Sequence, residues 1–379
     1  MAHRTCVCMF LYLILATPTR LTAAEEPGVK SEQFKTAIQL IQEQVESGLV
    51  GAAAFLVAHK GRIEVEQGFG SLSRQAGAKP CKSDSIFLVA SISKPVTTMA
   101  VMRLIDQKRI ALDDPVQKYL PEFTGEGRER ITIRNLLTHT SGLPDMLPNN
   151  VELRQKHAPL KDFVSGTLHT PLLFPPGTRV SYQSMGILLA SEIVERVSGM
   201  PLDRFLQRDV FGPLKMRHSS MGIGKRKIED TVQCDLPARG DLRMQDSDAS
   251  WNWNSPYWRN LGVPWGGMHT TVGDINRLLQ AMLDKGRPIL QPALGEAMIT
   301  NQNSKLDRPW GLGWEVGENA LFDGASAKVF GHSGATGTLC WADPDRNLTF
   351  VLFTNRPLDN DPSQFLRQVS KAVSDAVQR

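Results

Sequence analysis

The chain has 379 residues, of which 41% are hydrophobic and 22% are charged. These values are typical of a globular enzyme and exclude a disordered or fibrous protein. Basic and acidic residues nearly balance, 43 against 39, without a long run of either sign. Because nucleic-acid binding requires a concentrated basic surface, the charge pattern gives no support to a nucleic-acid partner.

The first 24 residues have the layout of a secretory signal peptide. Arg4 lies near the start, an apolar run covers 6–16, and small residues end at Ala24. This layout predicts cleavage near Ala24 and export to the periplasm or the medium. An uncleaved anchor is the alternative, but the apolar run is shorter than the roughly 20 residues that a bilayer span requires. No transmembrane span is expected in the mature chain, 25–379, because no later apolar run is long enough.

Both ends of the mature chain combine helical and strand-like patterns. Apolar residues at helical spacing predict one helix near each terminus, and alternating patterns predict two pairs of strands. The helices are expected at 31–47 and 362–377, and the strands at 53–59, 62–67, 338–342 and 348–354. Asp361 can cap the second helix. Three cysteines lie beyond the signal segment, so one disulfide at most can form.

The middle of the chain is rich in helical patterns, clearest at 131–138, 184–197 and 201–210. We therefore predict an α/β protein of the α+β sandwich type. Its antiparallel sheet is flanked by N- and C-terminal helices, and an all-helical domain is inserted between its two halves. The α/β part is expected at about 25–87 and 256–379, and the helical insertion at about 88–255. Within the insertion, the polar stretch 222–255 is a long connection, functional or mobile.

The segment 87–95 is the most informative for chemistry because Ser91 and Lys94 form an S-x-x-K pattern. Pro95 is tolerated only in the first turn of a helix, and the apolar residues after it predict that the helix is buried. A lysine sheltered from water at the positive end of a helix can accept a proton from the serine. The backbone N–H of Ser91 would be free to stabilise an oxyanion. On this segment alone, the alternative is an N-cap serine beside an exposed lysine.

Two more segments carry polar groups next to turns. The loop 174–184 delivers Tyr182 and Ser184 just before a predicted helix. The glycine-rich strand entry 331–337 carries the imidazole of His332 and a hydroxyl group. Glycines there allow the backbone of a substrate to approach closely.

Together, these three segments resemble the serine β-lactamase and penicillin-binding-protein superfamily, in its class C β-lactamase-like, DD-peptidase and esterase branch. The stretch 131–143 and Gly266-Gly267-Met268 are similar to further family signatures, so the resemblance covers nearly the whole mature chain. It implies a β-lactamase/transpeptidase-like fold. It also implies that Ser91 is the acylated nucleophile, that Lys94 is its partner and that Tyr182 acts in proton transfer. The N–H of Ala335 would be the second oxyanion donor beside that of Ser91.

The chain departs from the family pattern at two positions. His332-Ser333-Gly334 stands where the family has K-T-G, and Ser184 stands where the Y-x-N element has asparagine. By the resemblance, Ser184, Ser333 and Gly334 belong to the substrate site. His332 is expected to be catalytic, because the leaving group would receive its proton through Tyr182 or His332. An imidazole with an ordinary pKa of about 6.5 is largely neutral near pH 7 and is expected to become charged toward pH 6. The replacement of lysine therefore lowers the expectation of efficient β-lactam turnover.

Competing sites are weakly supported. The remaining histidines show no metal-ligand spacing, and no G-x-S-x-G elbow, dinucleotide or P-loop glycine pattern is present, so neither a metal nor a cofactor is expected. His139 is interpreted as a core residue rather than a base. Trp251, Trp253, Tyr257 and Trp258 could wall a substrate groove, but we favour packing that anchors the long connection.

The sequence therefore predicts an exported serine hydrolase that forms an acyl-enzyme and hydrolyses an ester or amide in a small molecule or peptide. Short esters, D-amino-acid peptides and β-lactams are the candidate substrates. The alternative is a penicillin-binding or cell-wall-fragment sensor that becomes acylated without turnover. The sequence leaves open the substrate, the base for deacylation and the oligomeric state.

Overall fold

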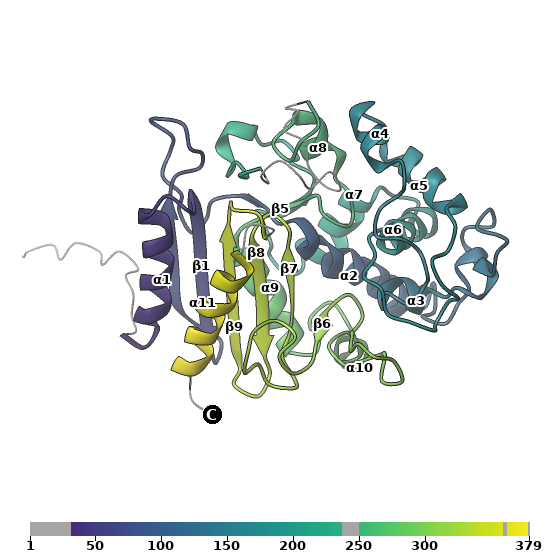
Figure 1. The fold of residues 1–379 in the computed structure, drawn as a ribbon. Helices are drawn as coiled ribbons and strands as arrows, with labels where there is room; N and C mark the ends of the chain where they lie inside the picture. Colours follow the sequence, from purple (N-terminus) through teal and green to yellow (C-terminus); the bar gives the residue numbers. More distant parts are fainter. Residues whose placement is uncertain (1–31, 237–249, 359–361, 378–379) are drawn as a thin grey trace, which may run out of the picture.

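A six-stranded antiparallel sheet, built from both ends of the chain, forms the centre of the molecule (Figure 1). The computed structural model describes residues 32–236, 250–358 and 362–377. In spatial order the strands are β2 (Arg62–Gly70), β1 (Ala52–His59), β9 (Leu348–Thr354), β8 (Thr338–Asp343), β7 (Phe330–Gly334) and β6 (Glu315–Val316). Because β1 pairs directly with β9, the predicted strands near the two termini lie side by side.

Helices cover both faces of this sheet. On one face, α1 (Lys35–Glu46) and α11 (Pro362–Ala376) form a single apolar cluster with the β1 side chains Phe55 and Val57. On the other face, Ala54 and Leu56 pack in the larger core with α2 (Ser93–Asp106) and α9 (Val272–Leu283). This alternation along β1 follows from the two-residue period of a strand. The predicted fold class is confirmed, whereas the Asp361 cap lies outside the described residues.

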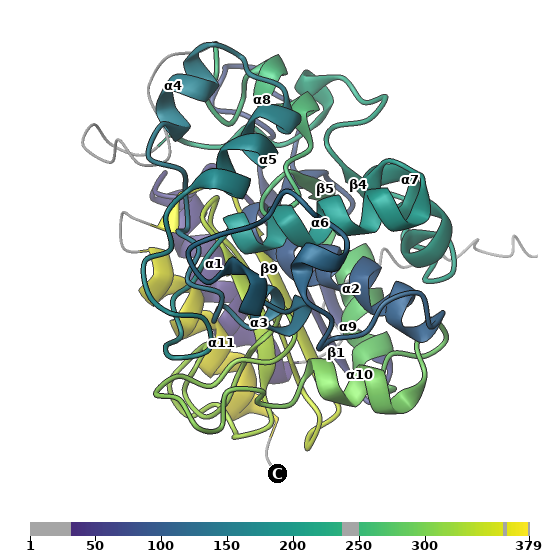
Figure 2. The ribbon, with the colours of Figure 1, turned by 90° about the vertical axis from the view of Figure 1, so that its right-hand side faces the viewer.

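Among the helices from the middle of the chain, α6 (Met185–Ser198) and α7 (Leu202–Leu206) pack against α2 (Figure 2). The predicted helices at 131–138, 184–197 and 201–210 are observed as α3 (Ile133–Leu137), α6 and α7, the last continuing as a π-helix (Gln207–Phe211). The other helices are α4 (Asn150–Gln155), α5 (Leu160–His169), α8 (Pro256–Leu261) and α10 (Pro292–Met298). Short 3-10 turns cover Glu32–Phe34, Ala90–Ile92, Val116–Lys118, Arg128–Arg130 and Ile228–Asp230. A small antiparallel sheet, which the sequence patterns did not predict, joins β3 (Phe87–Leu88), β5 (Met268–Thr270) and β4 (Ser220–Met221).

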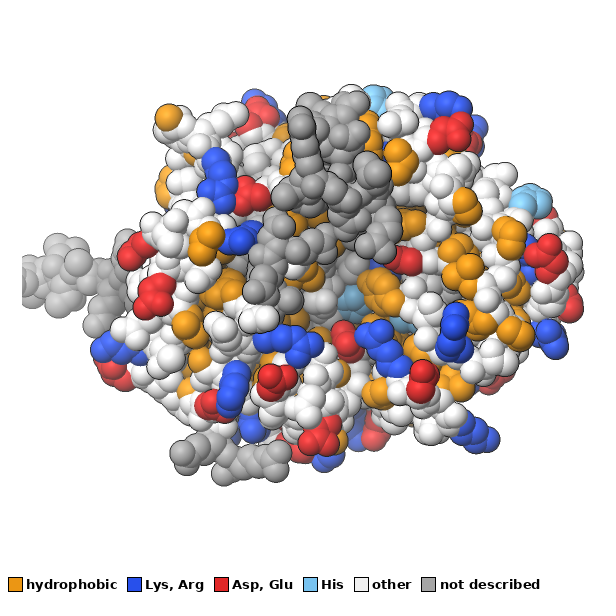
Figure 3. Space-filling model, viewed as in Figure 1, with side chains coloured by type: hydrophobic (Ala, Val, Ile, Leu, Met, Phe, Trp, Pro, Cys, Tyr) orange, Lys and Arg blue, Asp and Glu red, His pale blue; other side chains and the backbone are white. Residues whose placement is uncertain are grey.

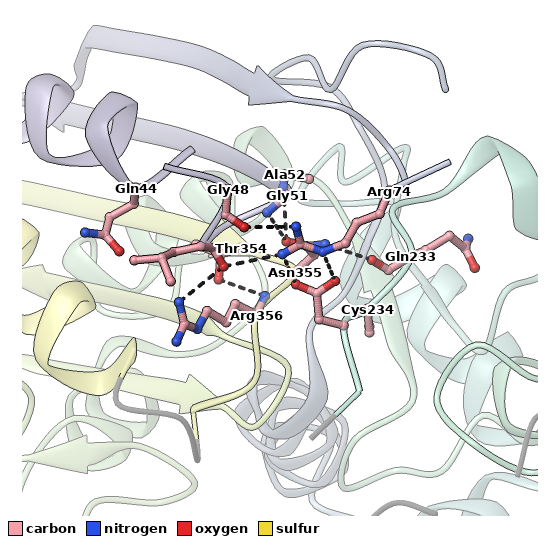
Figure 4. Close-up of polar contacts among 12 residues, drawn as sticks. Gln44, Gly48, Gly51, Ala52, Arg74, Gln233, Cys234, Thr354, Asn355 and Arg356 are labelled. Carbon is pink, nitrogen blue, oxygen red and sulfur yellow. Dashed lines mark hydrogen bonds and ion pairs between the residues drawn. The ribbon is translucent and has the colours of Figure 1, made fainter. Parts of the chain in front are cut away.

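Asn355 ties three distant parts of the chain together (Figure 4). Its side-chain oxygen accepts hydrogen bonds from the N–H groups of Gly51 and Ala52, both at 3.0 Å. Its amide group donates to the carbonyl oxygen of Gln233 at 3.2 Å, and its own carbonyl oxygen accepts from the N–H of Asp235 at 2.7 Å. Residues 233–235 of the long connection are thereby fixed to both halves of the sheet.

The surface carries mixed charge. On the face shown in Figure 3, basic and acidic side chains are interspersed over the part that is not grey. Within the described ranges, the structure has no helix long and apolar enough to cross a membrane. Cys81, Cys234 and Cys340 are buried free thiols.

Candidate active site

Ser91 lies in a tight turn between β3 and α2. The residue before it, Ala90, has a φ of +44°, a left-handed conformation that is strained for a residue with a side chain. The Ser93 hydroxyl donates to the Ala90 carbonyl oxygen at 2.6 Å and accepts from the N–H of Met268 at 3.0 Å. These bonds hold the strained turn in place, and strain that surrounding contacts maintain in this way is common at functional sites.

Lys94 is 1% exposed and faces Ser91. Its Nζ donates to Ser91 Oγ at 3.0 Å and to the carbonyl oxygen of Trp265 at 3.1 Å. Burial lowers the pKa of Lys94 to about 8, and the negative charge of Asp145 opposes this shift. A neutral amine is therefore accessible close to neutral pH, in hydrogen-bonding contact with the serine hydroxyl.

Tyr182 lies next to Lys94, whose Nζ is 4.6 Å from the centre of the phenol ring. The ring packs against His139 and Trp310, with centroid distances of 4.8 and 5.9 Å. Burial raises the pKa of Tyr182 well above its ordinary value, and a hydrogen bond with the Ser91 side chain opposes this. The phenol therefore keeps its proton at neutral pH and can pass it on rather than act as a phenolate.

His139 belongs to the wall behind the site. It is buried, and its Nδ1 accepts a hydrogen bond from the N–H of Gln183 at 3.2 Å. Burial holds its pKa well below the ordinary value, so the ring is neutral. These contacts fit the interpretation of His139 as a core residue that orients the loop carrying Tyr182.

His332 lies on β7 and is only 2% exposed. Its Nδ1 is 2.6 Å from the carbonyl oxygen of Ser333. Burial, together with the positive charge of Lys94, lowers the pKa of His332 to about 3. The expectation that His332 becomes charged toward pH 6 is therefore wrong, because desolvation disfavours the imidazolium.

The turn after β7 is held against the strand that leads to Ser91. Thr336 Oγ1 donates to the Leu88 carbonyl oxygen at 2.8 Å, and Thr338 Oγ1 donates to that of Val89 at 3.1 Å. A Cβ atom on Gly334 would lie 2.2 Å from the Val89 carbonyl oxygen, so only glycine allows this approach. Ala335 is thereby placed on the same cavity as Ser91.

This cavity is partly open to solvent, and its empty space, open solvent included, is about 400 Å³. Its lining residues are Ala90, Ser91, Asp145, Met146, Arg154, Tyr182, Ser184, Trp253, Trp258, Trp265, Gly266 and Ala335. Of the predicted site residues, the cavity brings together Ser91, Tyr182, Ser184 and Ala335. Lys94 contacts Ser91 from below the cavity surface, whereas His332, Ser333 and Gly334 are not among its lining residues.

The aromatic cluster of the long connection contributes to the wall. Trp253 and Trp258 are buried and line the cavity, while Trp251 is buried without lining it. The Tyr257 hydroxyl donates to the Ala158 carbonyl oxygen at 2.8 Å. The cluster therefore both anchors the connection, as favoured from the sequence, and walls the cavity.

Two charged lining residues were missed by the sequence analysis. The Asp145 carboxylate accepts a hydrogen bond from Ser184 Oγ at 2.6 Å, and Arg154 is stacked on the Trp258 ring at 4.1 Å. Burial lowers the pKa of Arg154 to about 10. Asp145 lies two residues beyond the signature-like stretch 131–143, which could have drawn attention to it, whereas no pattern marks Arg154.

Within the described ranges, no group of three or more His, Cys, Asp or Glu side chains is arranged to hold a metal ion. The family model described as Beta-lactamase matches residues 37–373. The chain belongs to the β-lactamase family. It is thus a member of a family of serine hydrolases that work by acyl transfer, as the resemblance implied.

Individual relatives of this β-lactamase family protein carry several names. A protein from Escherichia coli (strain K12), provisionally named D-alanyl-D-alanine carboxypeptidase, is 26% identical over 376 residues, which cover 89% of this chain and 85% of the relative. The structure of EstCE1, described as a hydrolase with promiscuous acyltransferase activity, has a TM-score of 0.75 at 22% identity and covers 90% of this chain and 98% of its own. A penicillin-binding protein homologue from Caulobacter crescentus has a TM-score of 0.74 at 24% identity, covering 91% and 99%. These two structures show a shared fold.

Proposed function

We propose that the protein is an exported serine hydrolase that acylates Ser91 and prefers small, uncharged esters. The observation that carries the catalytic part is the 3.0 Å contact between Ser91 Oγ and the buried Nζ of Lys94. A lysine with a pKa of about 8 is a competent base close to neutral pH. Export is supported by the signal-like layout of residues 1–24.

In the proposed reaction, Ser91 Oγ attacks the ester carbonyl carbon while its proton moves to Lys94 Nζ. The N–H groups of Ser91 and Ala335 stabilise the tetrahedral oxyanion, and loss of one such donor costs about 3–4 kcal/mol in comparable sites. The leaving alkoxide receives a proton through Tyr182, which keeps its proton at neutral pH. Water then attacks the acyl-enzyme and releases the acid, restoring Ser91.

The preference for uncharged esters is inferred from the apolar part of the cavity wall and from His332, although Asp145 and Arg154 also line the cavity. Three tryptophans, Trp253, Trp258 and Trp265, line the cavity and offer an apolar surface to an acyl or alkyl group. His332, which replaces the family's lysine, is neutral and offers no fixed charge to a substrate carboxylate. A second candidate, hydrolysis of a D-amino-acid peptide, is favoured by the name of the Escherichia coli relative.

The test is intact-mass analysis after incubation with a fluorophosphonate, a penicillin and a short-chain aryl ester, followed by mapping of the modified peptide. The wild type should be labelled at Ser91 and should turn over the ester, whereas Ser91→Ala should do neither while remaining folded. Ser333→Ala is the matched control and should keep the label. Persistent labelling of Ser91→Ala would overturn the nucleophile assignment. Labelling of the wild type without hydrolysis of any of the three would instead identify the non-turnover sensor.

A further inference from the structure

A carboxylate that no sequence motif marked lines the same cavity as the proposed nucleophile. We infer that Asp145, oriented by Ser184, is a positioning residue that stabilises the protonated form of Lys94 and so sets the pH at which acylation begins. The inference rests on the proposed function, because it assigns Asp145 a part in the proton transfer from Ser91. It also gives Ser184 a role, since the serine acts on the carboxylate rather than directly on a substrate.

Two hydrogen bonds fix the orientation of Asp145. Ser184 Oγ donates to Asp145 Oδ1 at 2.6 Å, and the Ser184 N–H donates to the Asp145 carbonyl oxygen at 3.3 Å. Ser184 is itself buried at the start of α6. Ser141 adds order to the same loop, because its hydroxyl accepts from the N–H of Leu143 at 3.1 Å and donates to Gln183 at 2.6 Å. The carboxylate is therefore held on a rigid support, as a group that acts through its charge requires.

The other ionisable groups near Lys94 leave Asp145 as the main source of opposite charge. His139, from the loop after α3, and His332, from β7, are both kept neutral by burial. Tyr182 keeps its proton. Among the described residues, Asp145 is the charged group that acts on Lys94 and raises its pKa against the effect of burial.

Two arginines lie nearby, and each faces an acidic side chain. Arg308, in the segment before β6, pairs with Glu315 at 3.2 Å. Arg154, on α4, interacts electrostatically with Asp145 while it stacks on the Trp258 ring. Desolvation lowers the pKa of Lys94, and the charge of Asp145 raises it.

The consequence for the reaction follows from charge. When the bond between Ser91 Oγ and the carbonyl carbon forms, the hydroxyl proton moves to Lys94 and creates an ammonium in a dry environment. An opposite charge on a fixed support stabilises that ammonium without the cost of reorganising solvent. Removing the carboxylate should therefore make Lys94 easier to deprotonate and, at the same time, a weaker proton acceptor.

The first experiment compares the pH dependence of kcat/KM for an uncharged aryl ester in wild type and variants. We expect the wild-type rate to rise through a midpoint near pH 8, where Lys94 loses its proton. In Asp145→Asn this midpoint should fall, and a fall of about half a unit would raise the fraction of the plateau rate reached at pH 6.5 about threefold. The plateau itself should fall. Ser184→Ala should shift the midpoint in the same direction but less.

Two controls separate charge from structure. Asp145→Glu keeps the charge and should keep a midpoint close to that of the wild type. Asp203→Asn removes an exposed carboxylate on α7 and should leave the profile unchanged. A uniform loss of activity in Asp145→Asn at every pH, with an unmoved midpoint, would overturn the inference and mark Asp145 as a structural or substrate-contacting residue.

A second readout does not depend on turnover. The Nζ resonance of Lys94, assigned with Lys94→Arg in protein carrying ¹⁵N-labelled lysine, reports its protonation directly by NMR. Its midpoint should be lower in Asp145→Asn than in the wild type, and equal midpoints would overturn the inference. If the midpoint moves while none of the esters or penicillins is a substrate, the proposed function fails and the effect of Asp145 on Lys94 stands.

Discussion

Burial of single ionisable side chains determines which chemistry this site can perform. Lys94, Tyr182 and His332 are all buried, and in each case desolvation is the largest cause of the shifted pKa. The result is an accessible neutral amine, a phenol that keeps its proton and an imidazole that stays uncharged. Such a set suits the transfer of a serine proton and offers no permanent charge at the position of His332.

The neutrality of His332 makes a direct prediction for substrate selectivity. With a pKa of about 3, only about one His332 side chain in a thousand is charged at pH 6. The ratio of kcat/KM for a penicillin to that for a short-chain ester should therefore stay within about twofold between pH 7.5 and pH 6, because any change in Lys94 affects both substrates alike. His332→Gln, neutral at every pH, should show the same flat ratio. A rise of the wild-type ratio toward pH 6 that His332→Gln lacks would show that His332 titrates in this range.

At the residue scale, the site residues were predicted best where a motif of reactive residues coincides with a clear helix pattern. The S-x-x-K pattern, followed by a proline and an apolar run, placed Ser91 and Lys94 together, and the structure brings their side chains to 3.0 Å. The depressed pKa of His332 could not be predicted, because it depends on how completely distant segments cover β7. Asp145 was missed for a similar reason: its neighbour Ser184 is 39 residues away along the chain.

At the scale of elements, the contact between the end of β7 and the strand before Ser91 aligns the two proposed oxyanion donors. In Gly334→Ala the added methyl group would meet the Val89 carbonyl oxygen at 2.2 Å, so one segment must move. We expect a loss of about 1–3 kcal/mol in the free energy of unfolding, as is common for overpacking. The fall in kcat/KM should exceed tenfold, because Ala335 moves away from Ser91. Urea denaturation and steady-state kinetics check both effects.

The matched control for this variant is Gly273→Ala on α9, where the nearest atom to an added Cβ is 3.6 Å away. A helical alanine there should be neutral or stabilising by up to about 1 kcal/mol. If kcat/KM in Gly334→Ala equals that of the wild type, the contact at the end of β7 does not align the N–H groups of Ser91 and Ala335.

The helices and strands that were predicted correctly have either a regular spacing or a continuous run of apolar residues. The terminal helices were found because each buries one face on the sheet, and a buried face leaves a regular apolar pattern. The strands β1, β8 and β9 were found as short apolar runs, because both of their faces are buried. The small sheet was not found, because β3 and β4 have two residues each and β5 has three. A segment that short cannot show alternation, and only its partners define it.

At the scale of the whole molecule, the fold is closed by pairing between the two ends of the chain. That both ends contribute strands could be predicted from their patterns, and the sheet order then follows from the contact of β1 with β9. The polar contacts that fix the long connection to this sheet could not be predicted, because Asn355 lies 122 residues from Gln233 along the chain. The boundaries of the helical insertion remain a prediction.

From the Asn355 contacts we predict that loss of a buried polar side chain lowers stability more than loss of an exposed one. Asn355 is 1% exposed, and its removal leaves the buried Ala52 N–H without its acceptor. Asn355→Ala should therefore lower the free energy of unfolding by about 1–3 kcal/mol for each buried group left unpaired. Arg74, whose side chain is 49% exposed, makes two 2.7 Å hydrogen bonds to the Asp235 carboxylate and one of 2.9 Å to the Gly48 carbonyl oxygen. Because water can replace the partners of an exposed side chain, Arg74→Ala should cost less than Asn355→Ala. Urea denaturation of both variants measures the difference in the free energy of unfolding. If Arg74→Ala loses as much stability as Asn355→Ala, or more, the ion pair of Arg74 rather than Asn355 holds the connection on the sheet.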